Sequence, residues 1–213
     1  MPELTKSTPV RQKGVIKINK QLELPVGTTL LSGPTGCGKT NLLKNLVTLE
    51  PWSALILLTS TAGASNEYED IPWTKTSTAT EEDVVETFDI IESMVNIGMS
   101  PRSLIVIDDP IGPELSISSR MKKLAGYVSK LRKYNCSLII MVQRYNVPAT
   151  TIRENLAYVY QWRTTVPILK QIHEECSITD SIDKVNDHLQ GPYSFIGITR
   201  NYIPSGGSNV RYF

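Results

Sequence analysis

The chain has 213 residues, of which 40% are hydrophobic and 20% are charged, and its formal net charge is +1. This length and composition suit one globular domain and exclude a disordered, collagen-like or coiled-coil chain, while the short apolar runs argue against a membrane span. Three cysteines without paired spacing, two distant histidines and an N-terminus without a secretory signal favour a reducing compartment and argue against secretion, disulfides and a zinc site.

The first predicted element is a β-hairpin, because residues 15–18 and 21–24 alternate between apolar and polar types around Asn19-Lys20. Strand-like apolar runs follow at residues 28–31, 55–59, 104–107, 138–142 and 158–162, with a late one at 193–199. Helical patterns lie between these runs. We therefore expect an α/β fold with a mainly parallel central sheet and helices on both faces.

A phosphate-binding motif follows the first of these strands. The sequence GPTGCGKT over residues 33–40 matches G-x-x-x-x-G-K-[ST] at every fixed position, between a strand and a helical segment. The residues expected to contact a nucleotide are Gly33, Pro34, Thr35, Gly36, Cys37, Gly38, Lys39, Thr40 and Asn41. A glycine-rich turn that binds nothing is the alternative, which this context disfavours.

The residue types in this loop explain its expected chemistry. Glycines let backbone N–H groups converge on phosphate oxygens, and the start of the following helix adds its positive dipole end. Lys39 is expected to reach the β- and γ-phosphates, and the Thr40 hydroxyl to bind Mg²⁺. Cys37 is expected to have no role in this chemistry.

The segment 61–80 has the weakest pattern of the chain, and we expect it to be a mobile loop. A helix is expected from about residue 81 to residue 97, because Thr80 and Asp83 form a capping-box variant and Gly98 is a natural stop. Its apolar residues recur at steps of three and four, and its other face is acidic. The stretch from Glu67 to Glu92 carries nine acids against one lysine.

Two later strands end in polar side chains that suit phosphate chemistry. The run 104–107 leads into Asp108 and Asp109, and the run 138–142 leads into Gln143. Since the carboxyl ends of parallel strands meet at one sheet edge, we expect Asp108 beside the phosphate loop, holding Mg²⁺ through water. Asp109 is then the candidate general base, and the Gln143 amide can bind both the γ-phosphate and the attacking water. The alternative for each of the two strands is that it simply ends in polar surface residues without a role in catalysis.

A second helix is expected from about residue 117 to residue 134, in a stretch without acids. Eight basic residues lie between Glu114 and Glu154, which suggests a face for a phosphate backbone or an acidic neighbour. Candidate DNA contacts are Lys122, Lys123, Lys130 and Lys133 on this helix, and Lys6, Arg11, Lys13 and Lys17 near the N-terminus. Both faces are equally compatible with an ordinary solvated surface.

Taken together, these motifs resemble the viral genome-packaging ATPases of the FtsK/HerA superfamily, the type found in poxviruses, other large DNA viruses and virophages. The resemblance covers the loop 33–40 (Walker A), the strand ending at Asp108-Asp109 (Walker B), the segment from Arg132 to Gln143, and residues 148–155, about 120 of the 213 residues. It implies an additional-strand P-loop NTPase fold in a single domain, residues 1–213. The arm and hairpin would occupy residues 1–27, the nucleotide-binding core 28–163, and C-terminal helices and a strand 164–213.

The resemblance also implies an activity and partners. We expect an ATPase that uses ATP and Mg²⁺, forms a pentameric or hexameric ring, and moves double-stranded DNA into a preformed capsid through a capsid or portal-vertex component. Gln143 would act as the sensor and Arg132 as the finger reaching the neighbouring subunit's γ-phosphate, with Arg153, Arg120 and Arg144 as alternatives. Many relatives carry Glu where this chain has Asp109. The expected location is the host cytoplasm, a viral factory or the virion.

Three other functions remain open on the sequence alone. A small-molecule kinase would need an arginine-bearing lid, and residues 61–80 contain no arginine. A GTPase would need a guanine-reading Asn-Lys-x-Asp segment after the loop, which is missing, although Asp109-Pro110-Ile111-Gly112 reads D-x-x-G. A non-catalytic assembly protein that binds nucleotide without turnover is the third alternative.

Overall fold

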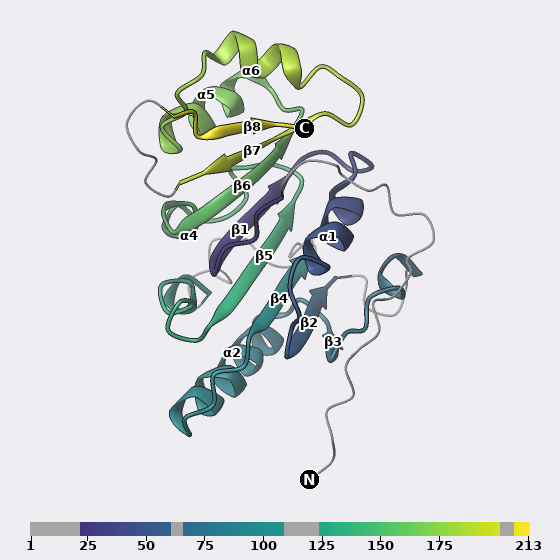
Figure 1. Cartoon of the computed structure of the whole chain (residues 1–213), viewed down its shortest axis with the longest axis vertical. Helices are drawn as coiled ribbons and strands as arrows, with labels where there is room; N and C mark the ends of the chain where they lie inside the picture. Colours follow the sequence, from purple (N-terminus) through teal and green to yellow (C-terminus); the bar gives the residue numbers. More distant parts are fainter. Residues whose placement is uncertain (1–21, 61–65, 109–123, 201–206) are drawn as a thin grey trace.

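The computed structural model describes residues 22–60, 66–108, 124–200 and 207–213. Its strands are β1 (Gly27–Ser32), β2 (Ala54–Thr59), β3 (Lys75–Ser77), β4 (Ser103–Asp108), β5 (Cys136–Val142), β6 (Leu156–Trp162), β7 (Phe195–Thr199) and β8 (Val210–Tyr212). In this part of the chain they form one eight-stranded sheet, in the order β3-β2-β4-β5-β1-β6-β7-β8 (Figure 1). Strands β1 to β6 pair in parallel, whereas β7 and β8 are antiparallel. The expected mainly parallel sheet is confirmed.

In the strand order, the strand that precedes the phosphate loop is not next to the strand that ends at Asp108. β5 lies between β1, which leads into the phosphate loop, and β4, which ends at Asp108. The register pairs Ser32 with Val142 and Asp108 with Met141, so the three strands end level with one another. This inserted strand is the feature that defines the additional-strand type, and that expectation is also confirmed.

The helices cover both faces of the sheet, as expected. They are α1 (Lys39–Val47), α2 (Glu81–Asn96), α4 (Thr150–Glu154), α5 (Val166–Glu175) and α6 (Ile182–His188), with a short 3-10 helix η1 (Asn66–Tyr68) and a helical stretch at 124–128. On one face, α1 buries leucines against the inward side chains of β2, β4 and β5. On the other face, α2, the 124–128 stretch, α4, α5 and α6 share a second core. The alternate residues of the central strands thus divide between two apolar layers.

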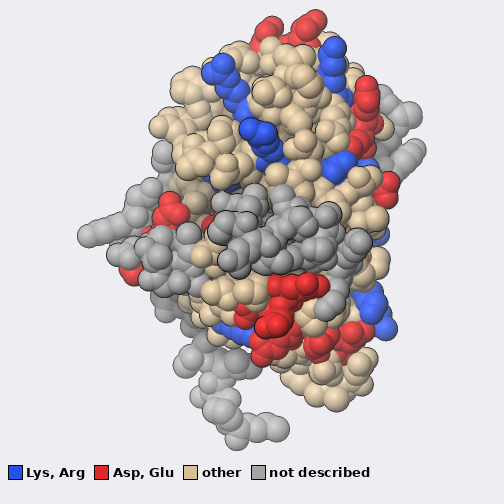
Figure 2. Space-filling model, turned by 180° about the vertical axis from the view of Figure 1, so that it is seen from behind, with Lys and Arg blue, Asp and Glu red and all other residues tan. Residues whose placement is uncertain are grey.

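Helix α2 follows from its sequence as expected. The Thr80 side chain accepts a hydrogen bond from the Asp83 N–H, which caps the first turn. Val84, Phe88 and Ile91 are buried, and Gly98 turns the chain out of the helix with a φ of 82°. The exposed face carries Glu82, Glu86 and Asp89, and Figure 2 shows acidic side chains gathered where α2 lies.

The expected second hairpin strand is wrong over residues 22–24, which form no strand. The reason is that the Glu23 backbone finds its partners in a side chain: its N–H donates to the Tyr160 hydroxyl at 2.9 Å, and that hydroxyl donates to its carbonyl at 2.8 Å. Leu22 and Leu24 pack on the core that α1 shares. The first strand of the expected hairpin lies outside the described residues.

The expected helix 117–134 is wrong after residue 128. Residues 124–128 are helical, but residues 129–135 form turns that end at Asn135, where φ is 50°. The N–H groups of Lys130 and Leu131 donate to carbonyls three residues back, which tightens the chain before it enters β5. Leu131 and Tyr134 are nevertheless fully buried, so the apolar spacing is satisfied without a continuous helix.

The expected loop 61–80 is also corrected in part. Residues 61–65 lie outside the described residues, but η1 and the edge strand β3 each occupy three of the remaining residues 66–80. β3 pairs with β2 from Ile56 to Leu58, and the Trp73 indole N–H donates to the Tyr68 carbonyl at 3.0 Å. This ordered connection brings η1 to the carboxyl edge of the sheet.

Candidate functional site

The phosphate loop has the backbone geometry that its glycines allow. Gly36 and Gly38 have φ values of 74° and 105°, a region that other residues rarely adopt. A Cβ at Gly33 would lie 2.7 Å from the Trp162 Cβ and 2.8 Å from the Cys37 sulfur, so the loop fits closely against β6. Gly38 caps α1 without a side-chain hydrogen bond. The first turn of α1 therefore presents its N–H groups to an anion in the loop.

Lys39 lies folded along the inside of the loop. Its ammonium group donates to the Gly33 carbonyl at 2.6 Å and to the Pro34 carbonyl at 3.0 Å. The same nitrogen lies 4.0 Å from the Cys37 sulfur. Burial raises the pKa of the Cys37 thiol, and the nearby Lys39 charge offsets only part of that effect. The loop thus places one ammonium group where phosphate oxygens would bind.

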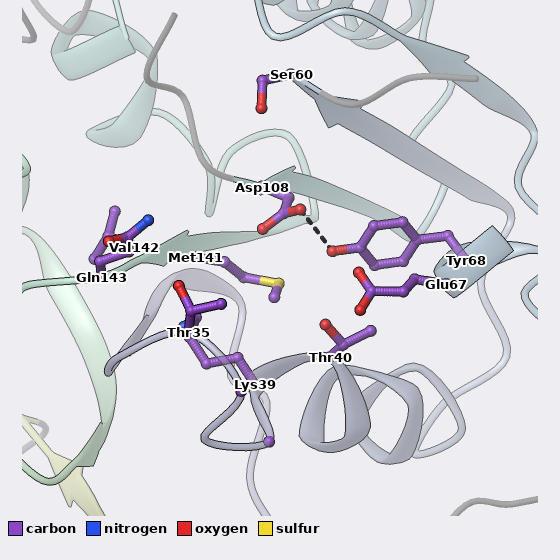
Figure 3. A pocket seen from close by; sticks show the side chains of 12 residues that line it. Thr35, Lys39, Thr40, Ser60, Glu67, Tyr68, Asp108, Met141, Val142 and Gln143 are labelled. Atoms are coloured by element: carbon purple, nitrogen blue, oxygen red, sulfur yellow. Dashed lines mark hydrogen bonds between the residues drawn. The ribbon is translucent and has the colours of Figure 1, made fainter. Parts of the chain in front are cut away.

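The loop opens into a cavity of about 400 Å³ at the carboxyl edge of the sheet (Figure 3). Its walls come from the loop, the ends of β2, β4 and β5, and η1. The lining residues are Thr35, Gly36, Gly38, Lys39, Thr40, Ser60, Glu67, Tyr68, Asp108, Met141, Val142 and Gln143. Gly33, Pro34, Cys37 and Asn41 belong to the loop or the first turn of α1 and do not line this cavity. The remaining five residues of the expected nucleotide-contacting set do.

Asp108 ends β4 inside this cavity, as its position in the sequence predicts. Its Oδ2 accepts a hydrogen bond from the Tyr68 hydroxyl at 2.6 Å and a longer one from the Thr59 hydroxyl at 3.4 Å. Burial, followed by the charge of Asp108 and the hydrogen bond to it, raises the pKa of Tyr68. The phenol therefore stays protonated and acts as the donor. Asp109, the candidate base, lies outside the described residues.

The oxygen atoms in the cavity suit a magnesium ion. The Thr40 hydroxyl and the Asp108 and Glu67 carboxylates line the same space (Figure 3). Mg²⁺ prefers such hard oxygen ligands and keeps several waters, so a site with few protein ligands beside a triphosphate fits its chemistry. Gln143 follows the last residue of β5, the strand that lies between β4 and β1, and it also lines the cavity.

The candidate finger arginines occupy very different places. Arg132 is exposed in the turn before β5, whose seven residues span about 23 Å at ~3.3 Å per residue, so it lies far from its own loop. Arg144 is exposed next to Gln143. Arg153 is only 8% exposed and pairs with Glu175, with its Nε 3.0 Å from Oε2. That contact within the chain argues against Arg153 as a finger, and Arg120 lies outside the described residues.

Lys130, one of the candidate DNA contacts, lies 3.3 Å from Glu92 at the acidic helix α2. Its charge is therefore balanced within the chain, which weakens its case. Lys133 is exposed in the same turn as Arg132. Lys122 and Lys123, together with Lys6, Arg11, Lys13 and Lys17, lie outside the described residues.

The sequence did not identify the residues between β2 and β3 that line the cavity. Ser60, Glu67 and Tyr68 all line it. The signal was weak because a single helical turn has no periodicity. The available clue was the aromatic pair Tyr68 and Trp73, whose rings meet edge-on at 6.3 Å and mark a packed segment.

Comparison with known protein families matches residues 19–190 of the chain to a family described as "Poxvirus A32 protein", which is well over half of its length. The chain belongs to the poxvirus A32 family. This membership confirms the kinship with the poxviral type that the motifs predict. No curated protein sequence matches this A32-family chain significantly.

Solved structures similar to this A32-family chain share its fold. The genome packaging NTPase B204 from Sulfolobus turreted icosahedral virus 2, in complex with ATP-gammaS, aligns with a TM-score of 0.58 and 11% identity over 87% of this chain and 95% of its own. The DNA-packaging ATPase B204 from Sulfolobus turreted icosahedral virus aligns with a TM-score of 0.60 and 11% identity, covering 89% and 98%. The pCW3 conjugation coupling protein TcpA gives a TM-score of 0.52 and 16% identity, covering 88% of this chain and 60% of its own. At such low identity these matches support the P-loop fold of the A32-family chain and nothing more.

In the described part of the A32-family chain, no helix combines the length and apolar content that crossing a bilayer requires.

Proposed function

We propose that this protein is an ATP-hydrolysing motor that moves double-stranded viral DNA into a preformed capsid. The observation that carries the proposal is the meeting of the loop, Asp108 and Gln143 in one cavity, on a fold that B204 shares. B204 is itself described as a DNA-packaging ATPase. Membership of the poxvirus A32 family points to the same viral setting, with the host cytoplasm or viral factory as the site of action.

The chain's own residues suit a phosphoryl transfer to water. The loop amides and Lys39 hold the β- and γ-phosphates, and Gln143 orients the attacking water against the γ-phosphorus. Asp109 accepts the water proton as the new P–O bond forms and the bond from the γ-phosphorus to the β,γ-bridging oxygen breaks, leaving ADP and phosphate. Most of the acceleration in such reactions comes from positioning and from stabilising developing negative charge.

In this proposal Mg²⁺ binds together with the nucleotide. Thr40 would hold Mg²⁺ directly and Asp108 through water, and the ion would neutralise charge on the phosphates when bound. Because Arg132 lies at the opposite end of β5 from its own loop, the positive charge at the γ-phosphate comes from the adjoining subunit of a ring, pentameric or hexameric. A capsid or portal-vertex component is the partner that receives the DNA.

The outer, acidic face of α2 is unsuited to contact DNA. Its exposed carboxylates at Glu82, Glu86 and Asp89 would repel a phosphate backbone (Figure 2). Lys133 and Arg132 lie in a turn that faces solvent. We therefore place the DNA-facing side nearer this turn than the outer face of α2.

The test is ATP hydrolysis by the full chain as a function of protein concentration, with and without duplex DNA. The rate per chain should rise with concentration because the finger acts between subunits. Added DNA should raise it further, and this stimulation should weaken with salt as counterion release becomes less favourable. Chelation of Mg²⁺ with EDTA should abolish turnover.

The matched control is Lys39→Ala, which removes the ammonium group from the loop and should lower the rate at least about 100-fold, the cost of losing one such charge-stabilising donor. A rate per chain that is independent of concentration, DNA and salt would contradict a DNA-driven ring. Transfer of the phosphoryl group to a small-molecule acceptor would instead favour a kinase.

A further inference from the structure

Tyr68 reaches across the cavity from η1 to the acid at the end of β4. Its hydroxyl donates to Asp108 Oδ2 at 2.6 Å, and Thr40 lines the same cavity. It therefore lies between the two residues that we assign to Mg²⁺, one on β4 and the other on α1 (Figure 3). No sequence motif identifies this residue.

The tyrosine is held firmly in this position. It is 5% exposed and belongs to the apolar core that α1 shares. Its ring meets the Trp73 ring edge-on, with an interplanar angle of 77°, and its carbonyl accepts from the Trp73 indole N–H and from the Ile71 N–H. The hydroxyl is thus a fixed donor rather than a mobile surface group.

This donor determines how the Asp108 carboxylate is turned. Both Tyr68 and Thr59 act on the same oxygen, Oδ2, which fixes the rotation of the carboxylate and hence the direction of Oδ1. Carboxylates at metal sites are commonly held by such partners. Loss of one partner typically costs about 10- to 100-fold in metal affinity or activity.

We propose that Tyr68 is a positioning residue of the metal–nucleotide site, whose hydroxyl holds Asp108, opposite Thr40, in the orientation that binds Mg²⁺ together with ATP. Tyr68 acts through Asp108 and contributes no ligand itself. The inference rests on the proposed function, because it requires a metal–triphosphate complex as the ligand of the cavity.

The experiment measures binding of Mn²⁺, a spectroscopic substitute for Mg²⁺, to the full chain by electron paramagnetic resonance in the presence of ATPγS. Tyr68→Phe removes only the hydroxyl and should weaken Mn²⁺ binding roughly ten-fold or more. The affinity of Tyr68→Phe for ATPγS, measured in EDTA, should equal that of the wild type, because the loop and Lys39 are unchanged. Unchanged tryptophan fluorescence of the chain, to which Trp73 contributes, would indicate that the ring at position 68 keeps its place.

Tyr127→Phe is the matched control. Its hydroxyl donates to Asp89 Oδ1 at 2.7 Å on α2, so the same change removes a tyrosine–aspartate hydrogen bond outside the cavity. This variant should bind Mn²⁺ like the wild type. Equal Mn²⁺ affinity in both variants would overturn the inference.

Two further results would also contradict it. Tighter Mn²⁺ binding in Tyr68→Phe would mean that the hydroxyl competes with the metal for Asp108. If the wild type itself bound no Mn²⁺ with ATPγS, the proposed function would fail and the inference with it. If the wild type binds Mn²⁺ with ATPγS and Tyr68→Phe binds it equally well, the inference about Tyr68 is wrong but the proposed function is not contradicted.

Discussion

Arg153 and Glu175 form a two-point ion pair beneath the segment that follows Gln143: Nε lies 3.0 Å from Oε2, and Nη2 lies 3.1 Å from Oε1. A third donor of Arg153, Nη1, contacts the Pro148 carbonyl at 2.7 Å. Tyr145, which is fully buried, donates to the same Glu175 carboxylate at 2.9 Å. The chain between β5 and α4 is thereby fastened to α5, on which Glu175 lies.

We expect Glu175→Ala to lower the free energy of unfolding by roughly 3 kcal/mol, because it leaves the buried Arg153 guanidinium without its counter-charge. Urea unfolding followed by circular dichroism measures this. Glu86→Ala is the control, since it breaks the exposed pair with Lys75 and should cost less than about 1 kcal/mol. Equal losses in the two variants would show that Arg153 finds another partner.

The same pair predicts a pH dependence of stability. Burial raises the pKa of Glu175, but hydrogen bonds from Arg153, Gln171 and Tyr145 outweigh it and lower the pKa from 4.5 to about 2. The unfolded chain therefore takes up a proton at this site between pH 4.5 and 2 while the folded chain does not, so acid favours unfolding. The contribution is complete above pH 4.5 and is lost as the pH falls toward 2.

Unfolding midpoints between pH 6 and pH 2.5 would test this for the wild type and Glu175→Gln. The variant cannot titrate at this position, so it should lose less stability on acidification. Other carboxylates titrate in both proteins, which leaves Glu175 as the difference. Parallel acid profiles would contradict the assigned pKa.

The sequence signals for the residues that line the central cavity are local. The motif at residues 33–40 and the apolar run before Asp108 each carry their meaning within a few residues, and strand ends in a parallel sheet meet at one edge. Tyr68 had no such signal, because its role depends on a contact with Asp108, 40 residues away. The pairing of Arg153 had no local signal either, because its partner, Glu175, is 22 residues away.

Fold details failed where tertiary contacts outweighed local pattern. The alternation at 22–24 suggested a strand, yet the Tyr160 hydroxyl takes the Glu23 backbone groups that a strand would pair. The apolar steps from Ile117 to Leu131 suggested one helix as far as Tyr134, yet Asn135 adopts a left-handed turn to enter β5. β8 pairs with β7 over only three residues, too few for a recognisable pattern.

Gly33→Ala should destabilise the chain by about 1–3 kcal/mol, the usual range for forcing a methyl group into packed space. Its Cβ would meet the Trp162 Cβ at 2.7 Å, an atom that cannot swing away as the end of a long side chain could. The loop should shift, and ATPγS binding should weaken. Thermal unfolding and calorimetry measure the two effects.

Gly126→Ala provides the opposite expectation. A Cβ there meets nothing within 4 Å, and the residue lies in the helical stretch 124–128. The change should stabilise the chain by about 0.5–1 kcal/mol, since alanine favours a helix over glycine. Similar effects of the two substitutions would exclude a steric role for Gly33.

The three cysteines should differ in reactivity. Cys136 and Cys176 are buried, whereas Cys37 is half-buried in the loop. Because burial raises the pKa of Cys37, little thiolate exists at neutral pH, and alkylation by iodoacetamide should be slow and should accelerate above pH 9. Bound Mg²⁺·ATP should protect Cys37. Mass spectrometry of the labelled chain tests this, and rapid labelling at pH 7 would contradict it.

The last prediction concerns the finger and distinguishes action within a subunit from action between subunits. Arg132 is exposed in the turn before β5, whose seven residues lead toward the cavity and span about 23 Å at ~3.3 Å per residue. Arg132→Ala should therefore keep its affinity for ATPγS but lose roughly 10³-fold in hydrolysis, the lower end of what arginine fingers contribute. Lys184→Ala, which removes an exposed charge on α6, should hydrolyse ATP normally.

Mixing two inactivated variants and measuring ATP hydrolysis tests directly whether Arg132 acts between subunits. Lys39→Ala lacks a working loop but keeps Arg132, whereas Arg132→Ala keeps the loop. In mixed rings an intact loop can face an intact Arg132, so the mixture should hydrolyse ATP faster than either variant does alone. If mixing restores nothing, Arg132 is not a finger acting between subunits, and the same cross should be made with Arg144→Ala, whose side chain is exposed next to Gln143.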